Sequence, residues 1–211
     1  MEREKNSGTK PEATRLEELW SGAFGDAYVE RNRQAGDVRR PFWDALLQEF
    51  PARSVLEVGC NLGANLRWIA ARVGAENTFG VDINAQALVA LQGILPGVNS
   101  CLAPARNLPF RDRWFDMVFT VGVLIHQPES TLPLVMAEIV RCSRRYVLCG
   151  EYHADQTTEV PYREQQGALF KRNYTRLYQE LFPELRLRKQ GFLSRADGWD
   201  DVTWALFEKC G

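Results

Sequence analysis

The sequence predicts an α/β fold: a doubly wound, Rossmann-like, seven-stranded and mostly parallel sheet with an antiparallel last strand and an N-terminal helical lid. Short apolar runs alternate with helical stretches of about ten residues between Ser54 and Gly150, which is typical of βαβ units. The chain has 211 residues, of which 45% are hydrophobic and 25% are charged. This length and composition indicate one ordinary core, so residues 12–211 are expected to form a single domain.

The region before the sheet is expected to be helical. Residues 1–11 are polar and are expected to form a disordered lead. Two short helices are expected at Glu12–Trp20 and Asp26–Arg33, separated by glycine-containing breaks. Asp37 is a plausible N-cap for a third, amphipathic helix that ends near Phe50.

The alternating region and the C-terminal region supply the strands. Five parallel strands are expected at Ser54–Val58, Thr78–Val81, Val98–Leu102, Phe115–Val123 and Arg145–Gly150. Helices are expected between and after them at Gly63–Val73, Ala85–Gly93, Thr131–Cys142 and Ala168–Phe182. Two last strands, Leu185–Leu193 and Val202–Phe207, flank a turn-rich segment and are expected to pair antiparallel at the end of the sheet.

Composition argues against several classes of partner. The 26 Lys and Arg residues against 27 Asp and Glu residues give a net charge of −1, so no nucleic-acid partner is expected. No run approaches the roughly 20 apolar residues of a membrane span and the start resembles no signal peptide, so no membrane contact and a cytoplasmic protein are expected. The five cysteines and two histidines show no zinc-ligand spacing, so free thiols and no metal are expected.

The sharpest local signal is the apolar strand that runs into a glycine-containing turn at residues 55–66. Gly59 allows a tight turn and a close approach by a ligand, and Gly63 is expected to do the same at the helix start. Dinucleotide sites use G-x-G-x-x-G, whereas the spacing here is G-x-x-x-G. Glu57 would repel a pyrophosphate but could accept hydrogen bonds from a cationic ligand. This combination disfavours NAD and FAD.

A second acid, Asp82, ends the next strand. An acid at this position can accept hydrogen bonds from both ribose hydroxyls of a nucleoside. The alternative is that Asp82 caps the following helix, a task that Asn84 could also perform.

These residues resemble the first two motifs of class I S-adenosylmethionine-dependent methyltransferases, and the similarity extends over residues 54–152. Asn61 stands where that family usually has its middle glycine. The resemblance implies S-adenosyl-L-methionine as the cofactor, with its amino-acid part near Glu57 and its ribose on Asp82. Adenine is expected between Ile83 and the loop after the third strand. Other residues expected to contact the cofactor are Gly59, Cys60, Asn61, Gly63, Ala105, Arg106 and Val121.

Tyr28 and Arg31 share one helix face at i and i+3 and could fold over the cofactor's carboxylate. The resemblance then divides the domain into a helical lid (12–52), a cofactor-binding core (53–152) and an acceptor-side segment with the last strands (153–211). The lid would exclude water from the reaction.

The segment 115–128 is similar to the family's fourth motif, whose strand ends facing the transferred methyl. His126 is expected to act as a general base or to position the acceptor, unless it only bonds backbone. Glu151 and Tyr152, after the fifth strand, are the other expected catalytic residues. The expected acceptor contacts are His126, Glu151, His153, Tyr162 and Arg163, because carboxylate, imidazole, phenol and guanidinium suit a polar acceptor.

Stretches along nearly the whole chain, such as 24–28, 122–126, 162–163 and 198–204, resemble a narrower group, the pseudaminic acid biosynthesis-associated methylases. That resemblance implies a small-molecule methyltransferase without fixing the acceptor. We expect methyl transfer to an N or O atom of a small polar metabolite, by a monomer or homodimer. Three alternatives stay open: a nicotinamide-dependent oxidoreductase, a non-catalytic cofactor-binding partner subunit and a nucleic-acid methyltransferase.

Overall fold

A computed structural model describes residues 11–33 and 37–210. The lead expected over residues 1–11 lies outside the described residues, apart from Pro11. Within these ranges no helix is long and apolar enough to cross a membrane. The same residues contain no group of three or more His, Cys, Asp or Glu side chains arranged to hold a metal ion.

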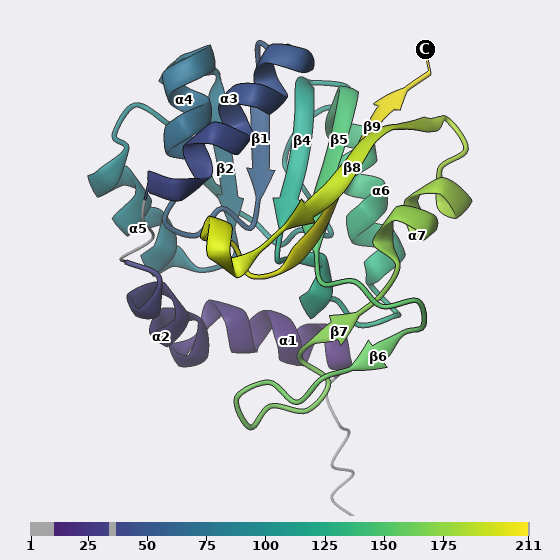
Figure 1. Cartoon of the computed structure of the whole chain (residues 1–211). Coiled ribbons are helices and arrows are strands. Elements are labelled where there is room, and N and C mark those ends of the chain that lie inside the picture. The colour runs from purple at the N-terminus through teal and green to yellow at the C-terminus, as the bar shows by residue number, and fades with distance from the viewer. Residues whose placement is uncertain (1–10, 34–36, 211) are drawn as a thin grey trace, which may run out of the picture.

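A seven-stranded sheet forms the centre of the molecule, in the order β3-β2-β1-β4-β5-β9-β8 (Figure 1). Its strands are β1 (Val55–Val58), β2 (Thr78–Asp82), β3 (Asn99–Leu102), β4 (Phe115–Val121), β5 (Ser143–Glu151), β8 (Leu185–Leu193) and β9 (Val202–Lys209). Strands β1 to β5 pair in parallel, and β9 runs antiparallel to both β5 and β8. The predicted doubly wound fold with an antiparallel last strand is confirmed.

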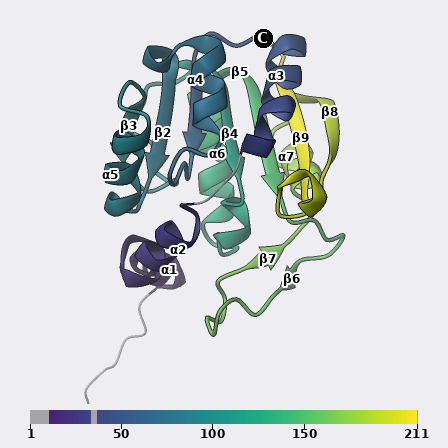
Figure 2. The same ribbon diagram turned by 60° about the vertical axis from the view of Figure 1, so that its left-hand side comes forward.

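Helices cover both faces of the sheet (Figures 1 and 2). One face packs against α3 (Arg40–Glu49), α4 (Leu66–Val73) and α5 (Ala85–Ile94), and the other against α6 (Leu132–Cys142) and α7 (Tyr174–Leu181). This two-sided burial explains why β1 and β4 read as continuous apolar runs in the sequence.

The N-terminal helices α1 (Glu12–Ser21) and α2 (Ala23–Arg31) lie across the end of the sheet where the parallel strands terminate (Figure 1). A small two-stranded sheet, β6 (Thr158–Glu159) and β7 (Phe170–Lys171), lies at the same end. Arg15 of α1 donates a 2.9 Å hydrogen bond to the carbonyl oxygen of Gln166 in the β6–β7 connection. Two segments remote in sequence therefore close over the carboxyl edge.

The predicted elements differ from the observed ones at several helix starts. The helices expected from Asp26 and Gly63 begin at Ala23 and Leu66. The helix expected to begin at Ala168 begins at Tyr174, because Phe170 and Lys171 pair with β6 and the side chain of Asn173 caps α7. The helix expected to follow Asp37 begins at Arg40, with Arg39 at its N-cap position, and a 3₁₀ turn spans Asp37–Arg39.

Candidate active site

A cavity of about 500 Å³ lies between the carboxyl ends of the strands and helices α1 and α2. Its volume is within the range of small-molecule sites. The turns after β1, β2 and β4 form its floor, and α1, α2 and the segments 162–163 and 199–202 form its walls. Open α/β sheets bind ligands at this edge.

The turn after β1 is held tightly against its neighbours. The backbone N–H groups of Gly59 and Cys60 both donate to the carbonyl oxygen of Val81, at 2.7 and 3.0 Å. Gly59 has φ of +76°, and a Cβ atom there would lie 2.3 Å from Cγ2 of Val123. Asn61 also adopts a left-handed φ, of +46°, which Asn tolerates better than most residues. Asn61 therefore supplies the backbone shape that a glycine would give.

Gly63 does not line the cavity, although it was expected to contact the cofactor. A Cβ atom at Gly63 would lie 2.5 Å from Cδ1 of Leu91 in α5, and its φ is +75°. Helix α4 begins only at Leu66. The structure thus gives Gly63 a packing role between the turn and α5.

Glu57 is a buried carboxyl with one oxygen bonded and one free. Its Oε1 accepts a 2.6 Å hydrogen bond from Nδ2 of Asn65, and Oε2 has no partner among the described residues. Oδ1 of Asn65 accepts in turn from Nη1 of Arg39 and Nε1 of Trp43. Burial raises the pKa of Glu57 to about 8, although the Asn65 bond and the charge of Arg39 lower it. The free oxygen suits a cationic hydrogen-bond donor in the cavity.

Asp82 is anchored by backbone and does not cap α5. Its Oδ2 accepts from the N–H of Asn61 at 2.8 Å and its Oδ1 from that of Asn84 at 2.9 Å. The side chain of Asn84 caps α5 by accepting from the N–H of Ala87. Burial raises the pKa of Asp82, although these backbone hydrogen bonds lower it. A carboxylate can accept about four hydrogen bonds, so Asp82 keeps capacity for a ligand.

Ile83, Ala105 and Arg106 line the cavity beyond Asp82, as expected for an adenine subsite. The side chain of Arg106 turns to α1, where its Nε lies 2.5 Å and its Nη2 3.0 Å from the two carboxylate oxygens of Glu17. Arg106 therefore ties the lid to the loop after β3.

His126 faces the cavity from the 3₁₀ turn Leu124–His126 that follows β4. Its Nδ1 lies 2.5 Å from the carbonyl oxygen of Ala168, so this nitrogen carries the proton and Nε2 is left as an acceptor. Burial lowers the pKa of His126 to about 4, although the Ala168 bond raises it. The imidazole is therefore neutral at physiological pH.

Aromatic side chains surround His126. The ring centroid of Trp20 lies 4.4 Å and that of Tyr162 5.3 Å from the His126 centroid. Trp20 also contacts Phe24 and Tyr28 edge to face, and its buried Nε1 has no partner among the described residues. The sequence analysis missed Trp20; the repeat of aromatics at positions 20, 24 and 28 was the signal that could have found it.

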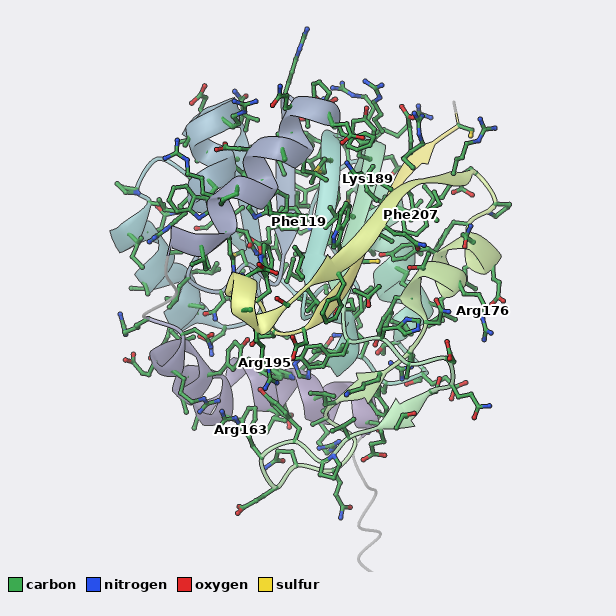
Figure 3. All side chains as sticks on the ribbon, viewed as in Figure 1. Phe119, Arg163, Arg176, Lys189, Arg195 and Phe207 are labelled. Atoms are coloured by element: carbon green, nitrogen blue, oxygen red, sulfur yellow. The ribbon has the colours of Figure 1, made fainter. Side chains whose placement is uncertain are left out.

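Most of the other residues predicted to contact the cofactor or the acceptor line the cavity, and the rest lie outside it. Those that line the cavity are Tyr28, Arg31, Cys60, Asn61, Val121, Tyr152, Tyr162 and Arg163. Burial raises the pKa of Tyr28 above its usual value and that of Tyr152 to about 12, so both phenols stay protonated. Figure 3 shows Arg163 at the end of the molecule where α1 and α2 lie.

Glu151 and His153, two expected acceptor contacts, do not reach the cavity. Glu151 is buried beneath the turn after β4, where its oxygens accept backbone hydrogen bonds from Val123 at 3.3 Å and Ile125 at 3.2 Å. His153 is partly exposed, and its Nε2 lies 3.3 Å from Oδ1 of Asp155. The structure therefore corrects both expectations: position after β5 does not by itself bring a side chain to the acceptor.

Sequence reasoning also missed Asp200, which lines the cavity. Its neighbour Trp199 is buried, with the guanidinium of Arg39 stacked 4.5 Å from its ring centroid. The Arg39 side chain thus joins this turn to the Asn65 and Glu57 network. Only tertiary folding brings these residues together, although the turn-rich 195–200 segment was visible in the sequence.

Comparison with known proteins adds a family match. Residues 55–145 match the family model described as a methyltransferase domain. The chain is 32% identical over 96 residues to methyltransferase GfsG of Streptomyces halstedii, covering 43% of this chain and 34% of that protein. It is 30% identical over 89 residues to a tocopherol O-methyltransferase of Arabidopsis thaliana, covering 39% and 25%. The chain therefore spans about a third or less of these curated relatives.

Solved structures match over most of the chain. The 1,6-didemethyltoxoflavin-N1-methyltransferase of Burkholderia thailandensis, with bound 1,6-didemethyltoxoflavin and S-adenosylhomocysteine, has a TM-score of 0.73 at 16% identity, covering 94% of this chain and 89% of that one. Magnesium protoporphyrin IX methyltransferase of Synechocystis PCC 6803, with bound S-adenosylmethionine, has a TM-score of 0.69 at 12% identity, covering 96% and 99%. The chain thus has the Rossmann-like fold of class I S-adenosylmethionine-dependent methyltransferases, and its family match covers the strands that form the cavity floor.

Proposed function

We propose that this chain binds S-adenosylmethionine and transfers its methyl group to an N or O atom of a small polar metabolite. One observation carries the proposal: a single cavity joins the free carboxyl oxygen of Glu57, the carboxylate of Asp82 and the neutral imidazole of His126. These groups suit, in that order, a ligand ammonium, ribose hydroxyls and a protonated acceptor atom.

The residues present fit the cofactor that the fold implies. The unpartnered Oε2 of Glu57 can accept from the α-ammonium group, and Arg31 can pair with the α-carboxylate. Asp82 can accept from the ribose, and Ile83 and Ala105 offer an apolar surface for adenine. The left-handed turn at Gly59 lets Val123 pack directly against the backbone of the turn that lines the cavity.

The activated methyl group is the chemistry that S-adenosylmethionine supplies when it is bound. The protein's task is then to position the acceptor and exclude water, since proximity alone lowers such barriers strongly. Nε2 of His126 can accept a hydrogen bond from an acceptor N–H or O–H and so orient its lone pair. With its pKa lowered to about 4, His126 is a weak base, so we assign it orientation rather than full proton removal.

The acceptor subsite supports a small polar molecule. Tyr152, Tyr162 and Arg163 line the cavity, the Tyr162 ring lies close to that of His126, and Arg163 can bind a carboxylate. The relatives include a tocopherol O-methyltransferase, a didemethyltoxoflavin N1-methyltransferase and a sterol C-methyltransferase, so they support small acceptors and do not select the acceptor atom. The proposal keeps two further expectations. The chain is similar to the pseudaminic acid biosynthesis-associated methylases, and the enzyme is a monomer or a homodimer.

Calorimetry tests the proposal. The wild type should bind S-adenosylmethionine at one site, and Asp82→Ala should bind it about tenfold more weakly or worse. The reason is that hydrogen bonds to a charged group are worth about 1.5–3 kcal/mol. Asp155→Ala, at an exposed carboxylate outside the cavity, is the matched control and should bind like the wild type.

A wild type that does not bind S-adenosylmethionine, or an Asp82→Ala variant with unchanged affinity, refutes the proposal. A fluorescence titration with NADH addresses the oxidoreductase alternative, for which binding of NADH would be required. Tight cofactor binding without transfer to any of a broad acceptor panel would instead favour a non-catalytic partner subunit.

A further inference from the structure

We propose that Glu151 is a positioning residue, whose buried carboxylate holds the turn at residues 122–127 so that His126 faces the acceptor and Val123 packs on the cofactor turn. The inference rests on the proposed function, because His126 matters only if an acceptor binds beside it. It assigns Glu151 a role different from the direct acceptor contact that the sequence suggests.

The carboxylate of Glu151 is directed at the backbone of one turn. The residue ends β5 and is 1% exposed. Its Oε1 accepts from the N–H of Val123 at 3.3 Å and its Oε2 from that of Ile125 at 3.2 Å. The N–H of Leu124 also stabilises the charged form. Glu151 forms no ion pair with any described residue, so the start of this 3₁₀ turn is its main partner.

The turn is fixed from its other side as well. The Ala168 carbonyl oxygen accepts from Nδ1 of His126, and the Gln127 carbonyl oxygen accepts from Nη1 of Arg172 at 3.1 Å. Arg172 is only 4% exposed and lies next to β7. Because Glu151 holds the entry of the turn and these bonds hold its exit, the His126 ring has one orientation.

The same turn contacts the cofactor side of the cavity. The methyl Cγ2 of Val123 occupies the space that a Cβ atom on Gly59 would need. The N–H of Gly122 donates to the carbonyl oxygen of Gly150, next to Glu151, at 2.8 Å. A shift of the turn would therefore move the acceptor contact at His126 and the packing on Gly59 together.

Burying the Glu151 carboxyl lowers the stability of the fold, so its place in the structure differs from that of an ordinary core side chain. A buried carboxyl without a charged partner destabilises the fold, and an apolar side chain would fill this place more cheaply. Burial raises the pKa of Glu151 to about 7, although the three backbone amides and the hydroxyl of Thr120 lower it. In a protonated carboxyl the carbonyl oxygen still accepts but the hydroxyl oxygen accepts only weakly, so the hold on the turn weakens as the pH falls through this value.

Glu151 has a pKa near neutrality, whereas the titratable groups that face it do not. These are Tyr174 and Tyr178 from α7, Cys149 from β5 and the neighbouring Tyr152. Burial raises the pKa of each of the four, so all stay protonated when Glu151 ionises.

The chain's two histidines make a direct test possible without any acceptor. In protein labelled with ¹⁵N-histidine, His126 should give the signals of a single neutral tautomer, and His153, outside the cavity, is the internal reference. We expect the His126 signals to shift as the pH is lowered through about 7, well above the pH at which its own ring is protonated. The titration is repeated in Glu57→Gln, which removes the cavity carboxyl whose pKa burial raises to about 8.

Substitutions complete the test. Glu151→Gln places an amide donor against a backbone N–H, so the variant should lose the single His126 tautomer and the shift near pH 7. Glu151→Asp keeps the charge and should retain the shift, moved in pH. The matched control is Glu138→Gln, because Glu138 also accepts a backbone N–H, from Leu108, away from the turn.

Unchanged His126 signals in both Glu151 variants, or a wild-type titration with no shift near pH 7, overturn the inference. If Glu151→Gln does not fold, Glu151→Asp and the wild-type titration decide. All of these spectra are recorded on the free protein, so failure to bind S-adenosylmethionine would refute the proposed function without changing the outcome for Glu151.

Discussion

Two glycines with left-handed backbone, Gly59 and Gly122, differ in their surroundings. A Cβ atom on Gly59 would lie 2.3 Å from Val123, whereas a Cβ atom on Gly122, with φ of +68°, meets nothing within 4 Å. Gly122→Ala should therefore cost only the backbone strain, about 1 kcal/mol in the free energy of unfolding. Gly59→Ala adds a clash to that strain and should cost at least twice as much.

Urea unfolding of the two variants measures this difference, and calorimetry should find weaker S-adenosylmethionine binding in Gly59→Ala. Equal losses of stability with equal cofactor affinity would mean that the contact between Gly59 and Val123 does not matter.

Single residues at strand ends were the most predictable part of the site. Glu57 and Asp82 follow apolar runs, and parallel strands place such residues at one edge of the sheet. Asn65 and Asp200 could not be predicted, because their proximity to the cavity depends on how helix α3 and a C-terminal turn pack. Glu151 shows the same limit: its position was predicted, and its direction depends on the backbone of a neighbouring turn.

At the level of elements, the strands of the core follow directly from the sequence, because burial on both faces makes them apolar runs. The structure of segment 168–182 could not be predicted in the same way, since Phe170 and Lys171 pair with a strand that lies about ten residues earlier in the chain. Local propensity alone favoured continuing the helix through them. Asn173 is a favourable N-cap residue and so was a signal that the helix begins after it, but the helical periodicity suggested an earlier start.

The lid is an element whose existence could be predicted and whose attachment could not. Helices α1 and α2 cover the cavity as expected, and Trp20 contributes an aromatic wall beside His126. Two of their polar ties are solvent-exposed, from Arg106 to Glu17 and from Arg15 to Gln166, and an exposed ion pair is worth at most about 1 kcal/mol. Asn84 adds a part-buried tie, because its Nδ2 donates to the carbonyl oxygen of Trp20 at 3.1 Å and to Oδ1 of Asp26 at 2.8 Å.

For the whole molecule, the buried acids predict that stability falls as the pH rises from 6.5 to 8. Burial raises the pKa of Glu57 to about 8 and that of Glu151 to about 7. Over this range the unfolded chain has both groups ionised, whereas the folded chain still holds protons on them. The folded state must release these protons as the pH rises, so the free energy of unfolding should drop by about 2 kcal/mol.

Urea unfolding at pH 6.5, 7.2 and 8 measures the slope, and Glu57→Gln should flatten it. His126, with its pKa lowered by burial, is neutral in the fold, whereas in the unfolded chain it is about half protonated at pH 6.5, so it opposes this slope by only about 0.4 kcal/mol. Stability that rises over this range would show that the two carboxyls are already ionised in the fold.

The measurement that addresses the central claim most directly is a crystal structure of the chain with S-adenosylhomocysteine. The account predicts the ligand in the cavity, with its ammonium within hydrogen-bond distance of Oε2 of Glu57 and its ribose hydroxyls on Asp82. His126 should stay bonded to Ala168, with Nε2 facing the acceptor side. A ligand bound elsewhere, or bound in the cavity with Glu57 Oε2 facing no donor, would contradict the account.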